Sequence, residues 1–215
     1  MQSELLREGP SRSPIERPES QSAPQRALSA SPVLLSERLV LRAPHIDDID
    51  ALAYLANNAK VATMVSRMPH PYTVADARAF VGRAAHGGIG KAVYAITKAD
   101  DGRFLGCCGI EQDASDPTRA EIGYWLGEPF WNLGYATEAA QVLVDMAFRS
   151  GPIETIDARC RVVNVASRRV IHKCGFQFQG TGMVPVLAMG GPVPVEWYRL
   201  DRRTWMSLRS WGGSR

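Results

Sequence analysis

A glycine-containing turn at residues 131–139 has the residue pattern of a phosphate-binding site. Residues 120–126 before it are rich in β-forming side chains, and the apolar residues after it recur at the spacing of one helix face. The chain therefore changes from strand to helix near residues 132–135. A helix start offers unpaired backbone N–H groups, and Gly134 and Ala136 leave the main chain open to an anion. Small residues at such a junction also serve packing, so the turn alone leaves both interpretations open.

A second segment, residues 164–176, is typical of a short helix with one basic face. Asn164 is placed to cap the start of this helix, and Ser167 lies in its first turn. Arg168, Arg169 and Lys173 lie on its polar side, where they would meet phosphate groups or simply face water. The segment thus combines an amide, a hydroxyl and three cations.

These two segments resemble the acyl-CoA motifs of the GNAT N-acetyltransferase superfamily, most closely its branch that includes ribosomal-protein N-terminal acetyltransferases. The resemblance extends over roughly residues 34–203, with 36–42 as the first strand and 120–126 as the central strand. It implies an α/β fold whose central mixed, mostly antiparallel sheet is flanked by helices. It also implies transfer of an acetyl group from acetyl-CoA to a primary amine, directly and in a ternary complex. The acceptor would be a protein N-terminus or a small-molecule amine.

The resemblance assigns the acetyl-CoA to the turn and to the segment that follows residue 164. Trp131 stands where most members of the superfamily have Gln or Arg, so we expect backbone N–H groups and the Thr137 hydroxyl to hold the pyrophosphate. The backbone N–H of Leu126 would polarise the thioester carbonyl if the strand is splayed there. The expected cofactor-binding residues are Leu126, Trp131, Asn132, Leu133, Gly134, Tyr135, Ala136, Thr137, Asn164, Ser167, Arg169 and Lys173.

Acylation of an amine by a thioester requires a base, donors at the developing oxyanion and a proton for the leaving thiolate, and it requires no metal. Glu121 is the first candidate for the base and Glu111 the second, acting directly or through water. Ile171 stands where many members carry a tyrosine acid, so attention moves to Ser167 as the contact to the cofactor sulfur. The alternative is a non-catalytic acyl-CoA-binding module, a sensor or interaction domain that needs neither base nor acid.

Length and composition predict one domain and a separate N-terminal extension. The chain has 215 residues, of which 45% are hydrophobic, enough for a single buried core. Residues 34–215 are expected to form this domain. Residues 1–33 alternate proline with polar residues, and we expect them to be disordered. No run approaches the roughly 18 apolar residues of a membrane span, so we expect neither a membrane nor a signal peptide.

Charge and cysteine usage narrow the partners and the compartment. The formal net charge is +3, and residues 149–215 hold 11 Lys and Arg against 4 Asp and Glu. A basic half suits a polyanionic cofactor, and no nucleic-acid recognition motif accompanies it. The four cysteines lack CxxC spacing, which predicts buried free thiols, no metal site and a reducing cytoplasm. A homodimer is a further expectation.

The order of elements supports a mixed sheet. Asp100-Asp101-Gly102 is a hairpin signal, and Thr73-Val74-Ala75-Asp76 resembles a capping box at a helix start. Acceptor specificity is expected from the helical region 57–90 and from a loop at 183–194. Strands are expected at 38–42, 93–97, 104–110, 120–126, 155–162, near 176 and at 195–200, and helices from Asp47, Thr73, Thr137 and Ser167.

Overall fold

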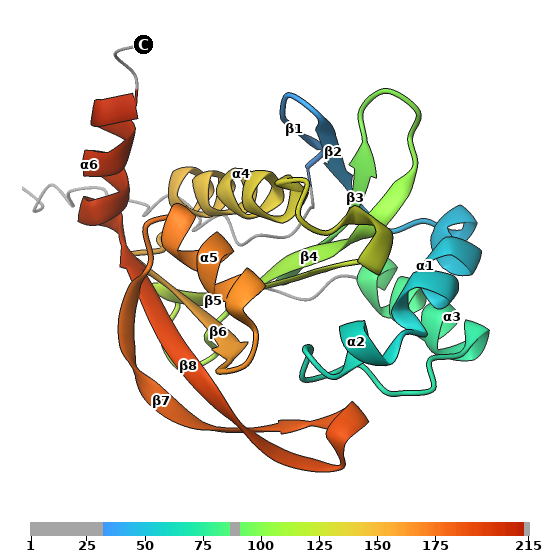
Figure 1. The fold of residues 1–215 in the computed structure, drawn as a ribbon. Helices are drawn as coiled ribbons and strands as arrows, with labels where there is room; N and C mark the ends of the chain where they lie inside the picture. The colour runs from blue at the N-terminus through green and yellow to red at the C-terminus, as the bar shows by residue number, and fades with distance from the viewer. Residues whose placement is uncertain (1–31, 87–90, 213–215) are drawn as a thin grey trace, which may run out of the picture.

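The computed structural model describes residues 32–86 and 91–212, so the prediction for residues 1–33 lies almost entirely outside the described residues. The described part contains one eight-stranded sheet in the order β1-β2-β3-β4-β5-β6-β8-β7 (Figure 1). Neighbouring strands run antiparallel except β5 and β6, which are parallel. The expectation of a mixed, mostly antiparallel sheet flanked by helices is confirmed.

The elements follow the predicted order closely. The strands are β1 (Leu34–Leu35), β2 (Leu39–Arg42), β3 (Lys91–Lys98), β4 (Phe104–Gln112), β5 (Arg119–Leu126), β6 (Thr155–Arg161), β7 (Gln177–Val186) and β8 (Gly191–Asp201). The α-helices are α1 (Ile49–Ala56), α2 (Ala59–Ala62), α3 (Val74–His86), α4 (Tyr135–Ser150), α5 (Val165–Lys173) and α6 (Arg202–Gly212). Short 3-10 turns are η1 (Ile46–Asp48), η2 (Glu128–Phe130) and η3 (Leu187–Met189).

Helices cover the two faces of the sheet unequally. The amphipathic helix α4 lies across one face, where Leu143 shares a buried cluster with Ile110 and Ile122 of the central strands (Figure 1). On the opposite face α1 and α3 pack against β3 and β4. Because side chains alternate along a strand, Cys108 enters the first cluster and Cys107 the second.

Local signals in the sequence produce the expected starts and turns. The Thr73 hydroxyl accepts from the Asp76 N–H (3.2 Å), and the Asp76 carboxylate accepts from the Thr73 N–H (2.8 Å), which confirms the capping box of α3. Gly102 has a φ of 72°, the left-handed conformation that lets the turn between β3 and β4 close.

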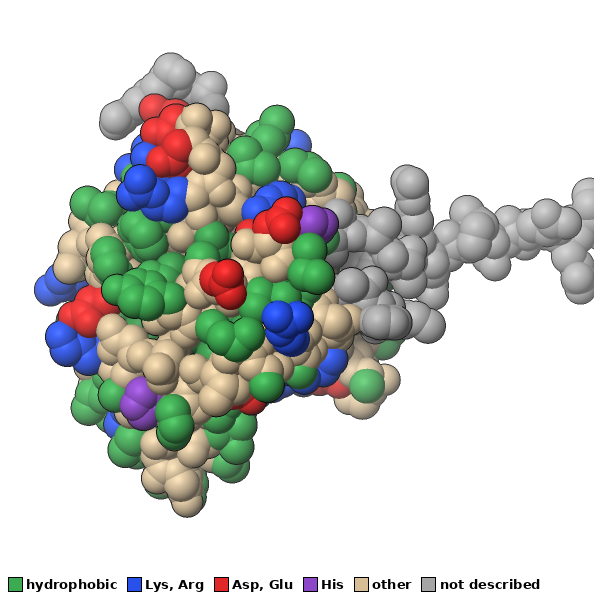
Figure 2. All heavy atoms as spheres, turned by 90° about the vertical axis from the view of Figure 1, so that its right-hand side faces the viewer, with side chains coloured by type: hydrophobic (Ala, Val, Ile, Leu, Met, Phe, Trp, Pro, Cys, Tyr) green, Lys and Arg blue, Asp and Glu red, His purple; other side chains and the backbone are tan. Residues whose placement is uncertain are grey.

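Viewed from the side of α1 and α3, the surface mixes apolar and charged side chains (Figure 2).

The expected loop at 183–194 is instead a long hairpin. β7 and β8 stay paired as far as Val186 and Gly191, and only η3 and Gly190 form the tip. Three valines at its end, Val186, Val193 and Val195, pack into a small buried cluster. The prediction was wrong because the glycines and prolines indicate a loop, whereas the valines between them support a strand.

Helix α6 was not predicted, and its place depends on one arginine. The guanidinium of Arg202 donates to the carbonyls of Phe148 and Gly151 and pairs with Glu154, which attaches the start of α6 to the end of α4. Trp205 then packs its ring against Phe148, with centroids 5.2 Å apart. These contacts join segments about 50 residues apart, which a local pattern in the sequence does not reveal.

A buried ion pair secures the junction between β2 and α1. The Asp48 carboxylate, 5% exposed, accepts from Arg42 at 2.7 and 2.8 Å and from the His45 N–H at 2.8 Å. Burial of Asp48 opposes its ionisation, but these hydrogen bonds outweigh burial and hold the pKa of Asp48 below its ordinary value. Asp48 therefore stays charged in the folded protein at neutral pH.

We expect Asp48→Asn to lower the free energy of unfolding by about 3 kcal/mol at neutral pH, because Arg42 would lose its charged partner. The folded-state pKa is depressed, so the contribution is present above the unfolded pKa of about 3.9 and disappears as pH falls through the folded value. Urea unfolding at several pH values measures this. Asp47→Asn, at an exposed carboxylate next to it, is the control and should change stability by less than about 0.5 kcal/mol. Equal loss at neutral pH and at pH 2 would contradict the assignment.

Candidate functional site

The two parallel strands of the sheet, β5 and β6, separate about halfway along their length. β5 and β6 pair from Arg119–Thr155 to Ile122–Ala158 and no further. Beyond that point β5 stays on β4 as far as Leu126, while β6 continues beside β8. A gap bounded by exposed backbone therefore opens between residues 123–126 and 159–161.

Backbone groups of β5 point into this gap. The Gly127 N–H donates to the Leu105 carbonyl at 2.9 Å, on the β4 side. Because successive residues of a strand bond to opposite neighbours, the Leu126 N–H points the other way, toward the gap. The splay on which the expected role of Leu126 depends is thus present.

The expected phosphate turn follows directly from the end of β5. Asn132 and Gly134 adopt left-handed φ values of 61° and 84°, and α4 begins at Tyr135 with Gly134 as N-cap. No side chain of the described residues caps this helix start, so its first N–H groups lack a side-chain partner there and suit an anion. The structure therefore brings the predicted residues 131–137 together at the N-terminus of a 16-residue helix.

Trp131 connects the turn to the gap. Its indole N–H donates to the Leu126 carbonyl at 2.8 Å, so this carbonyl is satisfied although β6 has moved away. The side chain is 37% exposed. Trp131 thus ties the turn before α4 to the end of β5.

Arg38, which was not predicted as a site residue, holds the turn from the side of β2. Its guanidinium donates to the Leu133 carbonyl at 3.0 Å and pairs with Glu138 at 2.7 Å. It also lies 4.7 Å from the centre of the Tyr135 ring. An added Cβ at Gly134 would stand 3.2 Å from Arg38, so this glycine is required both by its φ and by close packing. The motif around Arg38 signalled a strand but no contact to the turn.

A tyrosine and a serine meet across the gap. Asn164 caps α5 by accepting from the Ser167 N–H at 3.0 Å, as predicted. The Ser167 hydroxyl lies 3.0 Å from the hydroxyl of Tyr124 on β5. Burial raises the pKa of Tyr124 well above its ordinary value, so the phenol keeps its proton. Tyr124 was not predicted as a site residue, although the alternation of β5 places it with Ile122 on the side of α4 and α5. Ile171, at the position where a tyrosine was considered, is buried in the core.

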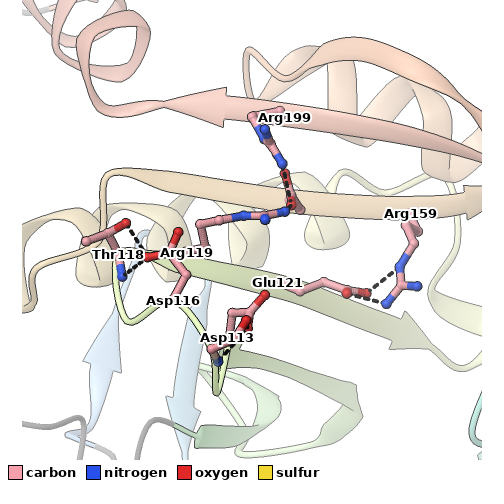
Figure 3. Close-up of polar contacts among 9 residues, drawn as sticks. Asp113, Asp116, Thr118, Arg119, Glu121, Arg159 and Arg199 are labelled. Atoms are coloured by element: carbon pink, nitrogen blue, oxygen red, sulfur yellow. Dashed lines mark hydrogen bonds and ion pairs between the residues drawn. The ribbon is translucent and has the colours of Figure 1, made fainter.

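The two candidate bases lie on the other face of the sheet. Glu111 and Glu121 are direct cross-strand partners on β4 and β5. Glu121 forms a two-point ion pair with Arg159 of β6, with Nε and Oε1 2.9 Å apart (Figure 3). The structure thus brings Glu121 beside Glu111 and separates it from Ser167 by the thickness of the sheet.

Glu111 is held by two cations. Arg67 donates at 2.9 Å and Lys91 at 3.1 Å to the same carboxylate oxygen. Partial burial opposes ionisation of Glu111, but the hydrogen bonds from these cations outweigh burial and keep its pKa below the ordinary value. Glu111 is therefore a weak proton acceptor.

Of the basic residues on α5, the predicted pair Arg169 and Lys173 is exposed. Arg168, the third cation expected on this face, is instead bound to Glu196 at 2.7 Å and to the Val162 carbonyl. Arg169 and Lys173 are thus the residues of this helix face whose charges are open to a ligand.

The chain's four cysteines are all buried, and burial raises the pKa of each thiol. A buried thiol with a raised pKa is a poor nucleophile, so these residues do not favour covalent catalysis. Within residues 32–86 and 91–212 no cluster of His, Cys, Asp or Glu is arranged to hold a metal ion. In the same residues no helix is long and apolar enough to cross a membrane.

Comparisons with known proteins agree with this geometry. A protein of Bacillus licheniformis, described as the uncharacterized N-acetyltransferase p20, is 28% identical over 79% of this chain and 96% of its own length. The ribosomal-protein-serine acetyltransferase of Escherichia coli is 38% identical, over 41% of this chain and 48% of its own.

Solved structures share the fold at lower identity. RimL, a ribosomal α-N-protein acetyltransferase in complex with coenzyme A, superposes with a TM-score of 0.67 at 23% identity, covering 79% of this chain and 97% of that one. MccE, a microcin self-immunity acetyltransferase in complex with acetyl-CoA and AMP, gives 0.66 at 20% identity, covering 80% and 98%. The family model of the GNAT acetyltransferase domain matches residues 38–177, and the chain belongs to this family of N-acetyltransferases.

Proposed function

We propose that this protein transfers the acetyl group of acetyl-CoA directly to a primary amine, with both substrates bound at the gap between β5 and β6. The observation that carries the proposal is the gap itself. It has an anion-binding helix start at one end, a backbone donor at Leu126 and the Tyr124–Ser167 pair across its width. The buried free thiols suit a reducing cytoplasm as its place of work.

The residues present fit acetyl-CoA. The uncapped N–H groups at the start of α4 and the Thr137 hydroxyl would hold the pyrophosphate, and Arg169 and Lys173 would meet the remaining phosphate. Asn164 would face the pantetheine arm. Acetyl-CoA supplies an activated acyl thioester, and the Leu126 N–H would stabilise the negative charge that develops on its carbonyl oxygen.

We expect CoA and acetyl-CoA to raise the melting temperature with increasing concentration, and ATP and NAD to do so much less. Gly134→Val should abolish this shift, because the branched side chain strains a φ of 84° and fills the approach to the helix start. Gly102→Val is the matched control, since Gly102 has a similar φ of 72° in a turn with open space around it. Both variants lose stability, but only the first should lose CoA binding. Stabilisation by ATP equal to that by CoA would refute the assignment.

Glu121 is the proposed base, and Glu111 remains the second candidate. Glu121 faces the side of the sheet away from α4, from which an acceptor can approach the gap without passing the cofactor. Arg159 keeps its carboxylate oriented by the two-point contact. Proton transfer from the amine can be direct or pass through one water molecule.

We expect Glu121→Gln to preserve CoA affinity and to lower turnover by roughly 10²–10⁴-fold. The loss should shrink at alkaline pH, where more of the acceptor is already neutral, so the variant's rate keeps rising with pH. Asp157→Asn is the control, because Asp157 lies beside Glu121 on β6 and is likewise paired with arginine. Full activity of Glu121→Gln would move the role to Glu111. If wild-type protein binds CoA but acetylates no amine of a broad panel, the non-catalytic module is the correct interpretation.

Tyr124 and Ser167 are proposed to protonate the leaving thiolate as one relay. Ser167 is the expected contact to the cofactor sulfur, and the Tyr124 phenol, protonated throughout the physiological range, can replace the proton that Ser167 gives up. The relay thereby takes the place of the tyrosine that is absent at Ile171.

We expect Tyr124→Phe and Ser167→Ala each to lower kcat by roughly 10²-fold at every pH, with CoA affinity retained. The double variant should be little worse than either single one, because both changes interrupt the same relay. Steady-state kinetics with a fixed acceptor measures this. Tyr54→Phe, at a tyrosine 80% exposed on α1, is the control and should be silent. Additive losses would show that the two hydroxyls act separately.

A further inference from the structure

Arg161, at the end of β6, differs from the other arginines of the sheet. Arg159 and Arg199 each present the edge formed by Nε and Nη2 to a carboxylate, Glu121 and Asp157 respectively. Arg161, on the same face of β6 as Arg159, has no such carboxylate partner among the described residues. The one side-chain hydrogen bond of Arg161 to the described residues runs from Nη1 to the Thr63 carbonyl at 2.9 Å.

The charge on Arg161 is therefore poorly compensated for its surroundings. Its Nε is buried and lacks a hydrogen-bond partner among the described residues, and no Asp or Glu of those residues lies within ion-pair distance. A partly buried charge of this kind is costly unless an anion joins it. A guanidinium binds carboxylate and phosphate best, because its planar fork matches their oxygens.

Arg161 lies on the acceptor side of the gap. It follows Asp157 and Arg159 at intervals of two along β6, so it shares their face of the sheet, opposite α4. It therefore points away from the helix start that is assigned to the cofactor phosphates. An anion at Arg161 belongs to the acceptor rather than to CoA.

One segment, residues 63–67, encloses this place. Thr63 accepts from Arg161, the Ser66 carbonyl accepts from the Leu187 N–H at the tip of the β7–β8 hairpin (3.0 Å), and Arg67 pairs with Glu111 on β4 (2.9 Å). The segment is thus attached to β6, to the hairpin and to β4. Because this bordering segment is fixed at three points, we take it to favour a small acceptor over a folded protein surface.

We propose that Arg161 binds the carboxylate or phosphate of a small acceptor amine, so that the enzyme selects amines that carry an oxyanion. The proposal rests on the proposed acetyl transfer and adds the class of its substrate. Because Nε is enclosed, the oxyanion approaches from the Nη2 side, while the bond from Nη1 to Thr63 keeps the guanidinium in place. Arg159 and Lys91 add positive charge nearby, but each is already paired with a glutamate.

The test compares matched amines, each amino acid with its amide and O-phosphoethanolamine with ethanolamine, by kcat/KM in wild type and Arg161→Gln. Wild type should prefer the anionic member of at least one pair, and the variant should lose about tenfold or more of that preference through KM. Each preference is the ratio of kcat/KM for the anionic amine to that for its neutral partner. Comparing this preference between wild type and Arg161→Gln cancels the difference in basicity between the two amines. Arg161→Lys should keep part of the preference. The amino-acid and phosphate pairs tell the two oxyanions apart.

Arg119→Gln is the matched control, since Arg119 lies on the same face but shares Asp157 with Arg199. It should leave the preference unchanged, and Arg161→Gln should leave the affinity for CoA unchanged. A preference that survives Arg161→Gln, or wild-type activity toward neutral amines or peptides equal to that toward anionic amines, overturns the proposal.

A binding measurement separates failure of this proposal from failure of the proposed function. N-acetyl amino acids and their amides are titrated calorimetrically into wild-type and Arg161→Gln protein saturated with CoA. Binding of the anionic compounds to wild type alone supports the oxyanion site even if no amine is acetylated. Absence of any such binding, together with absence of an anionic preference, refutes it.

Discussion

The parting of β5 from β6 is the constraint on which the rest of this structure depends. A strand that leaves its neighbour exposes backbone N–H and C=O groups that must find other partners. Here the Trp131 indole takes the Leu126 carbonyl, and the Tyr124 hydroxyl reaches the serine of α5. The Leu126 N–H remains as a donor aimed into the gap. The same departure that disrupts the sheet thus supplies both the space and the polar groups for chemistry.

The alternation of side chains along β5 then places the candidate site residues on two opposite faces of the sheet. Tyr124 points toward α4 and α5, where the cofactor is proposed to bind, whereas Glu121 three residues earlier points to the opposite side with the arginines of β6. One strand of eight residues therefore carries both the residue proposed to meet the cofactor and the residue proposed to meet the acceptor. The long β7–β8 hairpin contacts the segment around Ser66 on the side proposed for the acceptor, so the two proposed halves of the site depend on different parts of the chain.

Sequence reasoning succeeded where the signal was local. The Thr73 capping box, the turn at Gly102 and the Asn164 cap each depend on neighbours within a few residues, and all three are present. The partner of Tyr124 lies 43 residues away, and that of Arg38 in the turn 95 residues away. Such pairs follow from the packing of the whole sheet. The hairpin tip was misread because proline and glycine dominate its composition while pairing with β8 decides its conformation.

The position of β8 between β6 and β7 has a consequence for biosynthesis. Strands β1 to β6 are neighbours in the order in which the ribosome makes them, so this part of the sheet can assemble as the chain emerges. β7 and the outer edge of β6 must wait for residues 191–201, the strand synthesised after both. Until then the outer edge of β6 is open to pairing with other chains. An unfinished chain is therefore most exposed to aggregation at β6, the strand that bounds the gap opposite β5.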